Sequence, residues 1–168
     1  MLDARQHQYL SESGAQSVTY YETTGWRGVM EGVAGSPLPA RFPSIPDTVF
    51  PLYHVLADVG EFAGSQVLRS SSSEPLKAEC LALCKEGKRR LLVGNMSSET
   101  FPVCVRDLPD QVTVKVLDET TAWNAMVQPE EYRRREGLWQ STSGGELTVK
   151  LRPYAIVRID STAARGVA

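Results

Sequence analysis

Four side chains near the N-terminus could contact a small polar ligand. Tyr20 and Glu22 lie in the β-branched and aromatic run 17–22, and Trp26 and Arg27 lie in the glycine-bearing loop that follows. An aromatic face can stack on a sugar ring, and a guanidinium can form paired hydrogen bonds with a carboxylate. Each residue also has a structural interpretation: packing for Tyr20, a salt bridge for Glu22, and a loop anchor for Trp26 and Arg27.

Weaker candidates lie elsewhere in the chain. Glu31 is a carboxylate of the same kind as Glu22, and His54 lies on an expected helix, where a structural histidine is the commoner case. Trp123, Tyr132 and Trp139 could form a carbohydrate-binding platform, although such aromatics more often fill a core or an interface. Both interpretations stay open at this point.

Several kinds of chemistry have no signature here. The two histidines are distant in sequence and no Cys/His cluster is present, so we expect no metal. No G-x-S-x-G elbow, G-x-G-x-x-G or phosphate-binding loop occurs either, so we expect no cofactor. Cys80 and Cys84 lie four apart in an expected strand, about 13 Å, which is too far for a disulfide. With Cys104 they indicate buried thiols in a reducing cytoplasm.

Charge and hydropathy exclude two classes of partner. The net charge is −2, and the basic run 133–135 directly follows two glutamates, which is typical of a solvated face. We therefore expect no nucleic-acid partner. The first eight residues are polar and no apolar run approaches 18 residues, so we expect neither a signal peptide nor a membrane partner.

The first 64 residues have the pattern of an α/β protein. A helix is predicted over 3–13 and a strand over 17–22, joined by a very short link. A Gly- and Pro-rich loop covers 32–46, and a helix with Asp47 as its N-cap is predicted over 48–62. Only one such helix–strand unit is present, because 17–22 is the only strand predicted in this half. The strand needs neighbours in a sheet, so either it joins the second half as an edge strand or its partners lie upstream of Met1, which we favour.

From residue 65 onward the hydrophobic period changes to 2. Seven short strands and a hairpin turn at 85–88 predict an antiparallel β-sandwich over 65–160. The segment 120–136 reads as a long loop with one helical turn, and 161–168 as a disordered tail. The fold class is therefore mainly β, with an α/β remnant of residues 1–64 before the sandwich.

Three segments carry a family resemblance. The run 17–28 resembles the eighth strand and following loop of a glycoside-hydrolase-like (β/α)8 barrel, and 50–58 resembles its closing helix. The end of the chain, with Leu151-Arg152-Pro153-Tyr154, resembles the last strands of the β-sandwich that such enzymes carry. Within that group the chain is most similar to the D-apionate lactonase family.

The resemblance implies a hydrolase acting on a small sugar or sugar lactone. Its principal carboxylates would come from barrel strands four and seven, upstream of Met1, so this chain alone would be inactive. The β-domain would be structural and packed on the barrel. The alternative is a free-standing Ig-like module that binds glycan or protein through exposed aromatics.

Overall fold

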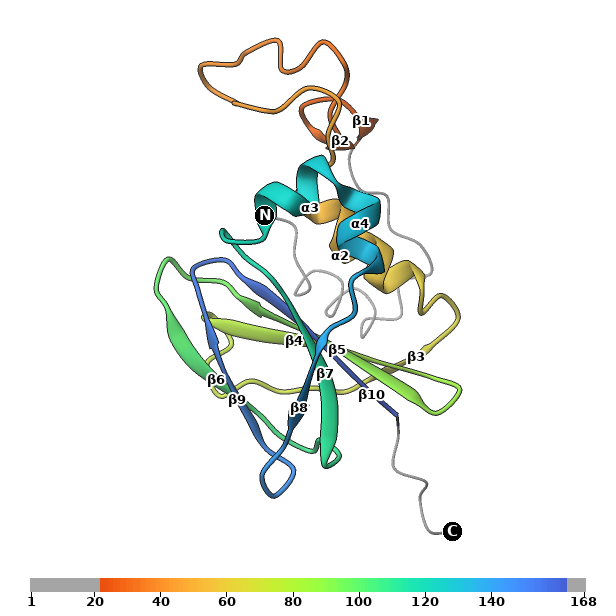
Figure 1. Ribbon diagram of the computed structural model, residues 1–168. Helices are drawn as coiled ribbons and strands as arrows, with labels where there is room; N and C mark the ends of the chain where they lie inside the picture. The colour runs from red at the N-terminus through yellow and green to blue at the C-terminus, as the bar shows by residue number, and fades with distance from the viewer. Residues whose placement is uncertain (1–21, 163–168) are drawn as a thin grey trace.

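The computed structural model describes residues 22–162, and two antiparallel sheets form its centre (Figure 1). This arrangement confirms the predicted β-sandwich. The smaller sheet pairs β6 (Phe101–Val105) with β9 (Leu147–Leu151). The larger sheet has six strands, in the order β3 (Gln66–Leu68), β4 (Ala78–Lys85), β5 (Lys88–Asn95), β10 (Ile156–Thr162), β7 (Gln111–Leu117) and β8 (Leu138–Ser141).

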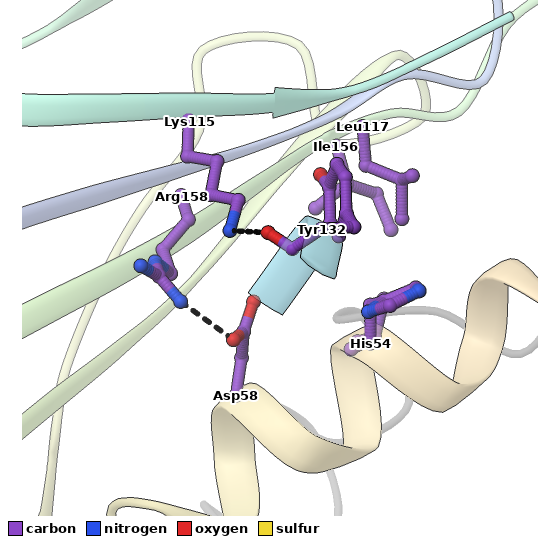
Figure 2. A pocket seen from close by; sticks show the side chains of 8 residues that line it. His54, Asp58, Lys115, Leu117, Tyr132, Ile156 and Arg158 are labelled. Atoms are coloured by element: carbon purple, nitrogen blue, oxygen red, sulfur yellow. Dashed lines mark hydrogen bonds and ion pairs between the residues drawn. The ribbon is translucent and has the colours of Figure 1, made fainter. Parts of the chain in front are cut away.

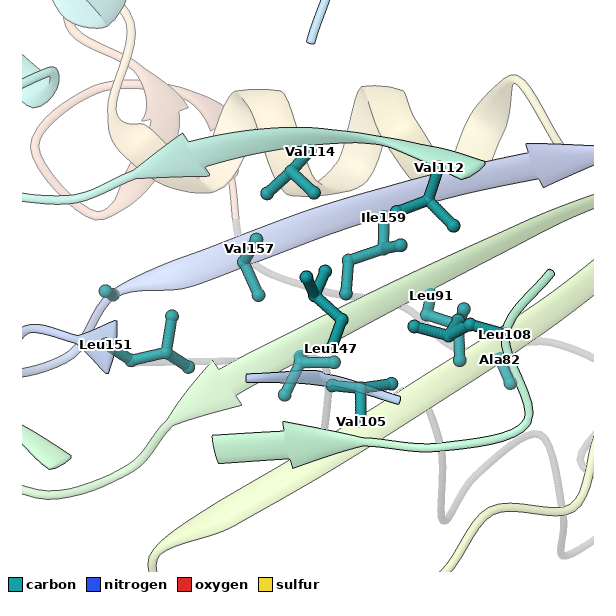
Figure 3. Packing of buried hydrophobic residues seen from close by; sticks show 12 residues of the cluster. Ala82, Leu91, Val105, Leu108, Val112, Val114, Leu147, Leu151, Val157 and Ile159 are labelled. Atoms are coloured by element: carbon teal, nitrogen blue, oxygen red, sulfur yellow. The ribbon is translucent and has the colours of Figure 1, made fainter. Parts of the chain in front are cut away.

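The main core lies between the two sheets (Figure 3). Strand alternation points Val157 and Ile159 of β10 toward Leu147 and Leu151 of the smaller sheet, and all four are at most 9% exposed. Burying each of these side chains contributes roughly 1.5–3 kcal/mol. The predicted hairpin between β4 and β5 also forms, with Glu86 at a positive φ of 51°.

Three helices lie beyond the other face of the six-stranded sheet (Figure 1). They are α2 (Pro51–Gly60), α3 (Ala122–Val127) and α4 (Pro129–Arg134). α2 and α4 pack on the sheet, and α3 contacts α2. Because alternate residues of a strand point to opposite faces, a second apolar cluster forms here. It joins Val55 of α2 to Leu81, Leu83 and Leu92 of the sheet.

Two short strands precede the helices. β1 (Glu22–Thr24) pairs in parallel with β2 (Gly28–Met30), and Met30 then forms a bridge with Val49. Glu22 is thus the last residue of the predicted strand 17–22 and lies in β1; the rest of that strand and the predicted helix 3–13 lie outside the described residues.

The structure corrects four local predictions. Asp47 does not cap the helix: its φ is 57°, and α2 begins at Pro51, three residues later than predicted, with Phe50 as the N-cap. The expected loop 120–136 contains α3 and α4, and β8, which was not predicted, follows them. Finally, β10 continues to Thr162, so the two residues after 160 belong to the sheet rather than to a tail.

Among residues 22–162, no helix has both the length and the apolar character needed to cross a lipid bilayer.

Candidate functional site

Three of the four predicted ligand-contacting residues lie together at the turn between β1 and β2. Arg27 Nη2 donates to Glu22 Oε1 at 3.0 Å. The guanidinium carbon of Arg27 lies 5.2 Å from the ring centroid of Trp26, a cation–π distance. The Trp26 ring in turn packs on Phe42, with centroids 4.6 Å apart. Both partners of the ion pair are more than half exposed.

Two glycines shape this turn. Gly25 has a φ of 116°, and its N–H donates to the Met30 carbonyl at 2.8 Å. A Cβ atom at Gly28 would lie 2.6 Å from the Glu22 carbonyl oxygen, so only glycine fits there. The chain therefore turns back closely enough to place the Arg27 guanidinium beside the Glu22 carboxylate.

The geometry favours ligand binding for Arg27 and Glu22 and a structural role for Trp26. Arg27 keeps donors exposed beside Glu22, so the pair can bind a ligand that offers both acceptors and hydroxyl donors. Trp26 already has Arg27 and Phe42 against its ring, which matches the loop-anchor interpretation better than sugar stacking. Tyr20 lies outside the described residues.

Glu31 is not part of this cluster. It is only 5% exposed, and its Oε1 accepts a hydrogen bond from the Gly32 backbone N–H at 2.8 Å. It shares no hydrogen bond or ion pair with Glu22, Trp26 or Arg27 in the part of the chain that is described. Its Oε2 is buried and has no hydrogen-bond partner among the described residues, so Glu31 is a candidate separate from this cluster.

A second group of polar residues fills the junction between α2 and the six-stranded sheet (Figure 2). Asp58 of α2 accepts hydrogen bonds from Arg158 of β10 at 2.8 Å and from Arg133 of α4 at 3.1 Å. Arg90 of β5 donates to Asp160 at 2.7 Å and to the Asp58 backbone carbonyl at 2.9 Å. The junction thus joins a helix near the N-terminus to the central strands of the sandwich.

The charges of the junction stabilise one another. Burial disfavours the charged form of Glu61, but hydrogen bonds from Arg90 and Arg133 outweigh this and lower the pKa of the Glu61 carboxyl. Burial likewise opposes the charge of Arg90, yet its bonds to Asp160 and Glu61 raise the pKa of the guanidinium. Such mutual pairing is what buried charges require.

Lys115 and Tyr132 also contribute to the junction. Lys115 Nζ donates to the backbone carbonyls of Tyr132 at 2.5 Å and of Arg135 at 2.8 Å, which caps the C-terminal end of α4. Burial, followed by the charge of Arg158, lowers the pKa of Lys115 to about 8. The Tyr132 hydroxyl donates to the Val116 carbonyl, and burial raises its pKa to about 12.

His54 has a structural environment. It is 2% exposed, and its Nε2 donates to the Ala125 carbonyl at 2.8 Å, tying α2 to α3. Burial lowers the pKa of the imidazole, so the neutral form is favoured. Within residues 22–162, no three metal-ligating side chains are grouped for a metal ion. The contacts of the junction hold α2, α3, α4 and the sheet together.

The three aromatics of the β-domain are separated in the structure. Trp123 on α3 is 63% exposed and Trp139 on β8 is 72% exposed, so core packing is wrong for both. Tyr132 is buried and contacts His54. No ring contact links the three within the described chain. The residues that sequence reasoning missed are Phe42 and the junction charges, because their partners lie far away in sequence.

Two family models match separate segments of the chain. Residues 75–159 match the family model "D-apionate lactonase, C-terminal immunoglobulin-like domain". Residues 4–64 match the model "D-apionate lactonase, TIM barrel domain". The search of curated proteins gave no match.

Solved structures share the fold at low sequence identity. A glycoside hydrolase family 30 subfamily 8 xylanase from Clostridium acetobutylicum has a TM-score of 0.67 and 10% identity, over 95% of this chain and 38% of that one. A bifunctional glucanase-xylanase from a metagenome library has a TM-score of 0.53 and 17% identity, over 97% of this chain and 34% of that one. The chain thus spans little more than a third of these enzymes.

The immunoglobulin-like model alone covers half of the sequence, and the barrel model covers most of the remainder. The chain therefore belongs to the D-apionate lactonase family.

Proposed function

We propose that this chain is the C-terminal part of a carbohydrate-active hydrolase that opens a sugar lactone, with the lactone of D-apionate as the expected substrate. The observation that carries the proposal is the exposed Arg27–Glu22 pair, which joins β1 to the turn that follows it. Barrel enzymes present their functional groups at the C-terminal ends of their strands. The two family models support the lactone assignment.

The Arg27–Glu22 pair could bind both the substrate and the product of lactone hydrolysis. Water adds to the lactone carbonyl, the ring C–O bond breaks, and the product carries a carboxylate and a new hydroxyl. Arg27 would bind the carbonyl oxygen of the substrate and then a carboxylate oxygen of the product. Glu22 would orient Arg27 and accept a hydrogen bond from a hydroxyl of the sugar.

The catalytic carboxylates would come from other barrel strands, upstream of Met1. A complete (β/α)8 barrel needs about 250 residues, whereas the barrel model matches only residues 4–64. On this proposal the 168-residue chain has no turnover by itself. The β-domain is structural and packs on the barrel, because α2 is joined to its sheet by the junction around Asp58.

Two experiments test this proposal. The first reads the coding DNA upstream of the Met1 codon, where we expect an open frame that encodes further βα repeats. An in-frame stop close upstream would contradict it. The second measures hydrolysis of the lactone of D-apionate by the protein encoded by the extended frame, in a pH-stat.

The kinetic variants are Arg27→Gln and Arg106→Gln. Losing a charge-assisted hydrogen bond at Arg27 should lower kcat/KM by roughly 10- to 100-fold. Arg106 is the matched control, because it forms an equally exposed ion pair with Glu146 at 2.9 Å, beyond the barrel remnant. Equal values of kcat/KM for the two variants would show that Arg27 does not contact the substrate.

A second candidate function is glycan binding by the β-domain. The observation that favours it is Trp139, which is 72% exposed on the edge strand β8. Exposed indole faces of this kind can stack on sugars. Affinity electrophoresis of the chain in gels containing soluble glycans tests it: retardation lost in Trp139→Ala supports the function, and unchanged mobility of the wild type argues against it.

We also place the protein in a reducing compartment, the cytoplasm. Cys80, Cys84 and Cys104 form no disulfide with one another; Cys80 and Cys84 are partly buried, whereas Cys104 is exposed, so the prediction of a buried thiol is wrong for Cys104. Burial raises the pKa of the Cys80 thiol to about 12, which disfavours its reactive thiolate form. Fractionation of the source cells, followed by immunodetection, tests the assignment.

A further inference from the structure

The long loop after β2 is closed by its own hydrogen bonds. The N–H groups of Gly35 and Asp47 both donate to the Gly32 carbonyl, at 2.9 and 3.3 Å. Ser44 Oγ accepts from the Ser36 N–H at 3.1 Å across the loop. The two ends of the loop therefore meet, as in the compact loops that are often functional.

The tip of this loop returns to the ligand-contacting cluster. The N–H of Phe42 donates to the Leu38 carbonyl at 2.9 Å, forming a single helical turn. The Phe42 ring lies 4.6 Å from the ring of Trp26, tilted by 48°. Phe42 is 48% exposed, so only part of this ring is buried in the contact with Trp26.

The contacts form a continuous series. Phe42 packs on Trp26, the guanidinium of Arg27 lies over the Trp26 ring at 5.2 Å, and Arg27 is paired with Glu22 at 3.0 Å. We infer that Phe42 is a positioning residue that fixes Trp26, and through it the guanidinium of Arg27, in the orientation that binds a carboxylate or lactone oxygen. This inference rests on the proposed function of Arg27.

Arg27 needs a positioning contact because an exposed arginine side chain is conformationally free. A guanidinium on the surface samples many rotamers, and a single exposed ion pair holds it weakly. A second contact on its planar face restricts the same side chain, so less entropy is lost when a ligand binds. The indole can supply that contact only if its own ring is held, and Phe42 is the ring that packs against it.

The test uses the ¹⁵N-labelled full protein encoded by the open frame that contains this chain, with D-apionate as the probe. The Arg27 Nε–H signal reports the orientation of the guanidinium, and the titration reports the affinity. The variants are Phe42→Ala, Phe42→Tyr, which retains the ring, and Val33→Ala, a control that lies in the same loop and is 81% exposed. Amide spectra of the sandwich confirm that each variant is folded.

We expect Phe42→Ala to shift the Arg27 Nε–H signal toward that of a free arginine and to weaken D-apionate binding by about three-fold, the weight of a cation–π contact. Phe42→Tyr and Val33→Ala should keep wild-type values. An Arg27 signal that does not respond to Phe42→Ala in the ligand-free chain overturns the inference. A signal that responds, in a chain that does not bind D-apionate, supports the positioning role and contradicts the proposed ligand.

Discussion

Asp58 Oδ1 accepts a hydrogen bond from Arg158 Nη1 at 2.8 Å, although the two residues lie 100 positions apart. Asp58 belongs to α2, and Arg158 to the central strand β10 of the sandwich. The same carboxylate oxygen also accepts from Arg133 of α4. One side chain therefore connects three elements, and its removal leaves two largely buried guanidinium groups without their shared acceptor.

Replacing Asp58 by asparagine should destabilise the chain strongly. The Asp58 side chain is 14% exposed, and breaking a buried ion pair from one side costs roughly 3 kcal/mol. Urea denaturation followed by circular dichroism measures the loss. The matched control is Glu119→Gln, whose ion pair with Arg152 is at least half exposed and should contribute less than about 1 kcal/mol. Equal losses in the two variants would contradict a buried junction.

Limited proteolysis should leave α2 attached to the sandwich. Val55 is 3% exposed and packs with Leu81 and Leu92 of the sheet, and His54 is bonded to Ala125. We therefore expect a protease-resistant core that begins before Pro51. Mass spectrometry of the fragments gives its N-terminus. A core that begins near residue 65, at the boundary indicated by the sequence pattern, would show that α2 is not part of the cooperative unit.

The sandwich strands were predictable because their alternation is a local signal. Val112, Val114 and Val116 alternate with polar residues, and the structure buries that face. β8 has no such pattern: Leu138 and Trp139 are both exposed at the edge of the sheet. α3 and α4 have six residues each, too few for a helical period to be recognised.

The candidate site was predictable only where its residues are neighbours in sequence. Glu22 and Arg27 lie five residues apart, and a strand-end turn brings them together. Phe42 reaches Trp26 through a loop whose closure depends on tertiary hydrogen bonds, and no sequence period reports it. The junction partners Asp58 and Arg158 appear in sequence as ordinary surface charges, since nothing local indicates that they are buried.

Asn95→Ala should be among the most destabilising substitutions. Asn95 is 1% exposed, and its amide donates to the carbonyls of Glu99 and Arg152, both at 2.7 Å. Its Oδ1 accepts from the Ser97 N–H at 2.8 Å. Leaving these buried groups unpaired should cost roughly 3 kcal/mol.

Thermal denaturation measures the effect of Asn95→Ala. Asn124→Ala is the control, because Asn124 is exposed on α3 and its loss should change stability by less than about 0.5 kcal/mol. If Asn95→Ala melted at the temperature of the control, the hydrogen-bond network around Asn95 would have no role in stability.

Stability should fall as the pH is lowered through the range in which His54 titrates. Burial lowers the pKa of His54 in the folded chain below 6.5, the value of an unperturbed histidine. Between these two pKa values the unfolded chain binds a proton that the folded chain does not, so acid favours unfolding. The contribution is fully present above pH 6.5 and decreases by at most about 1.4 kcal/mol for each pH unit below it.

The measurement is the free energy of unfolding of the wild type and of His54→Gln between pH 7.5 and 5. Because a glutamine side chain does not titrate, the difference between the two proteins should shrink as the pH falls; a difference that stays constant would show that His54 is not buried in its neutral form.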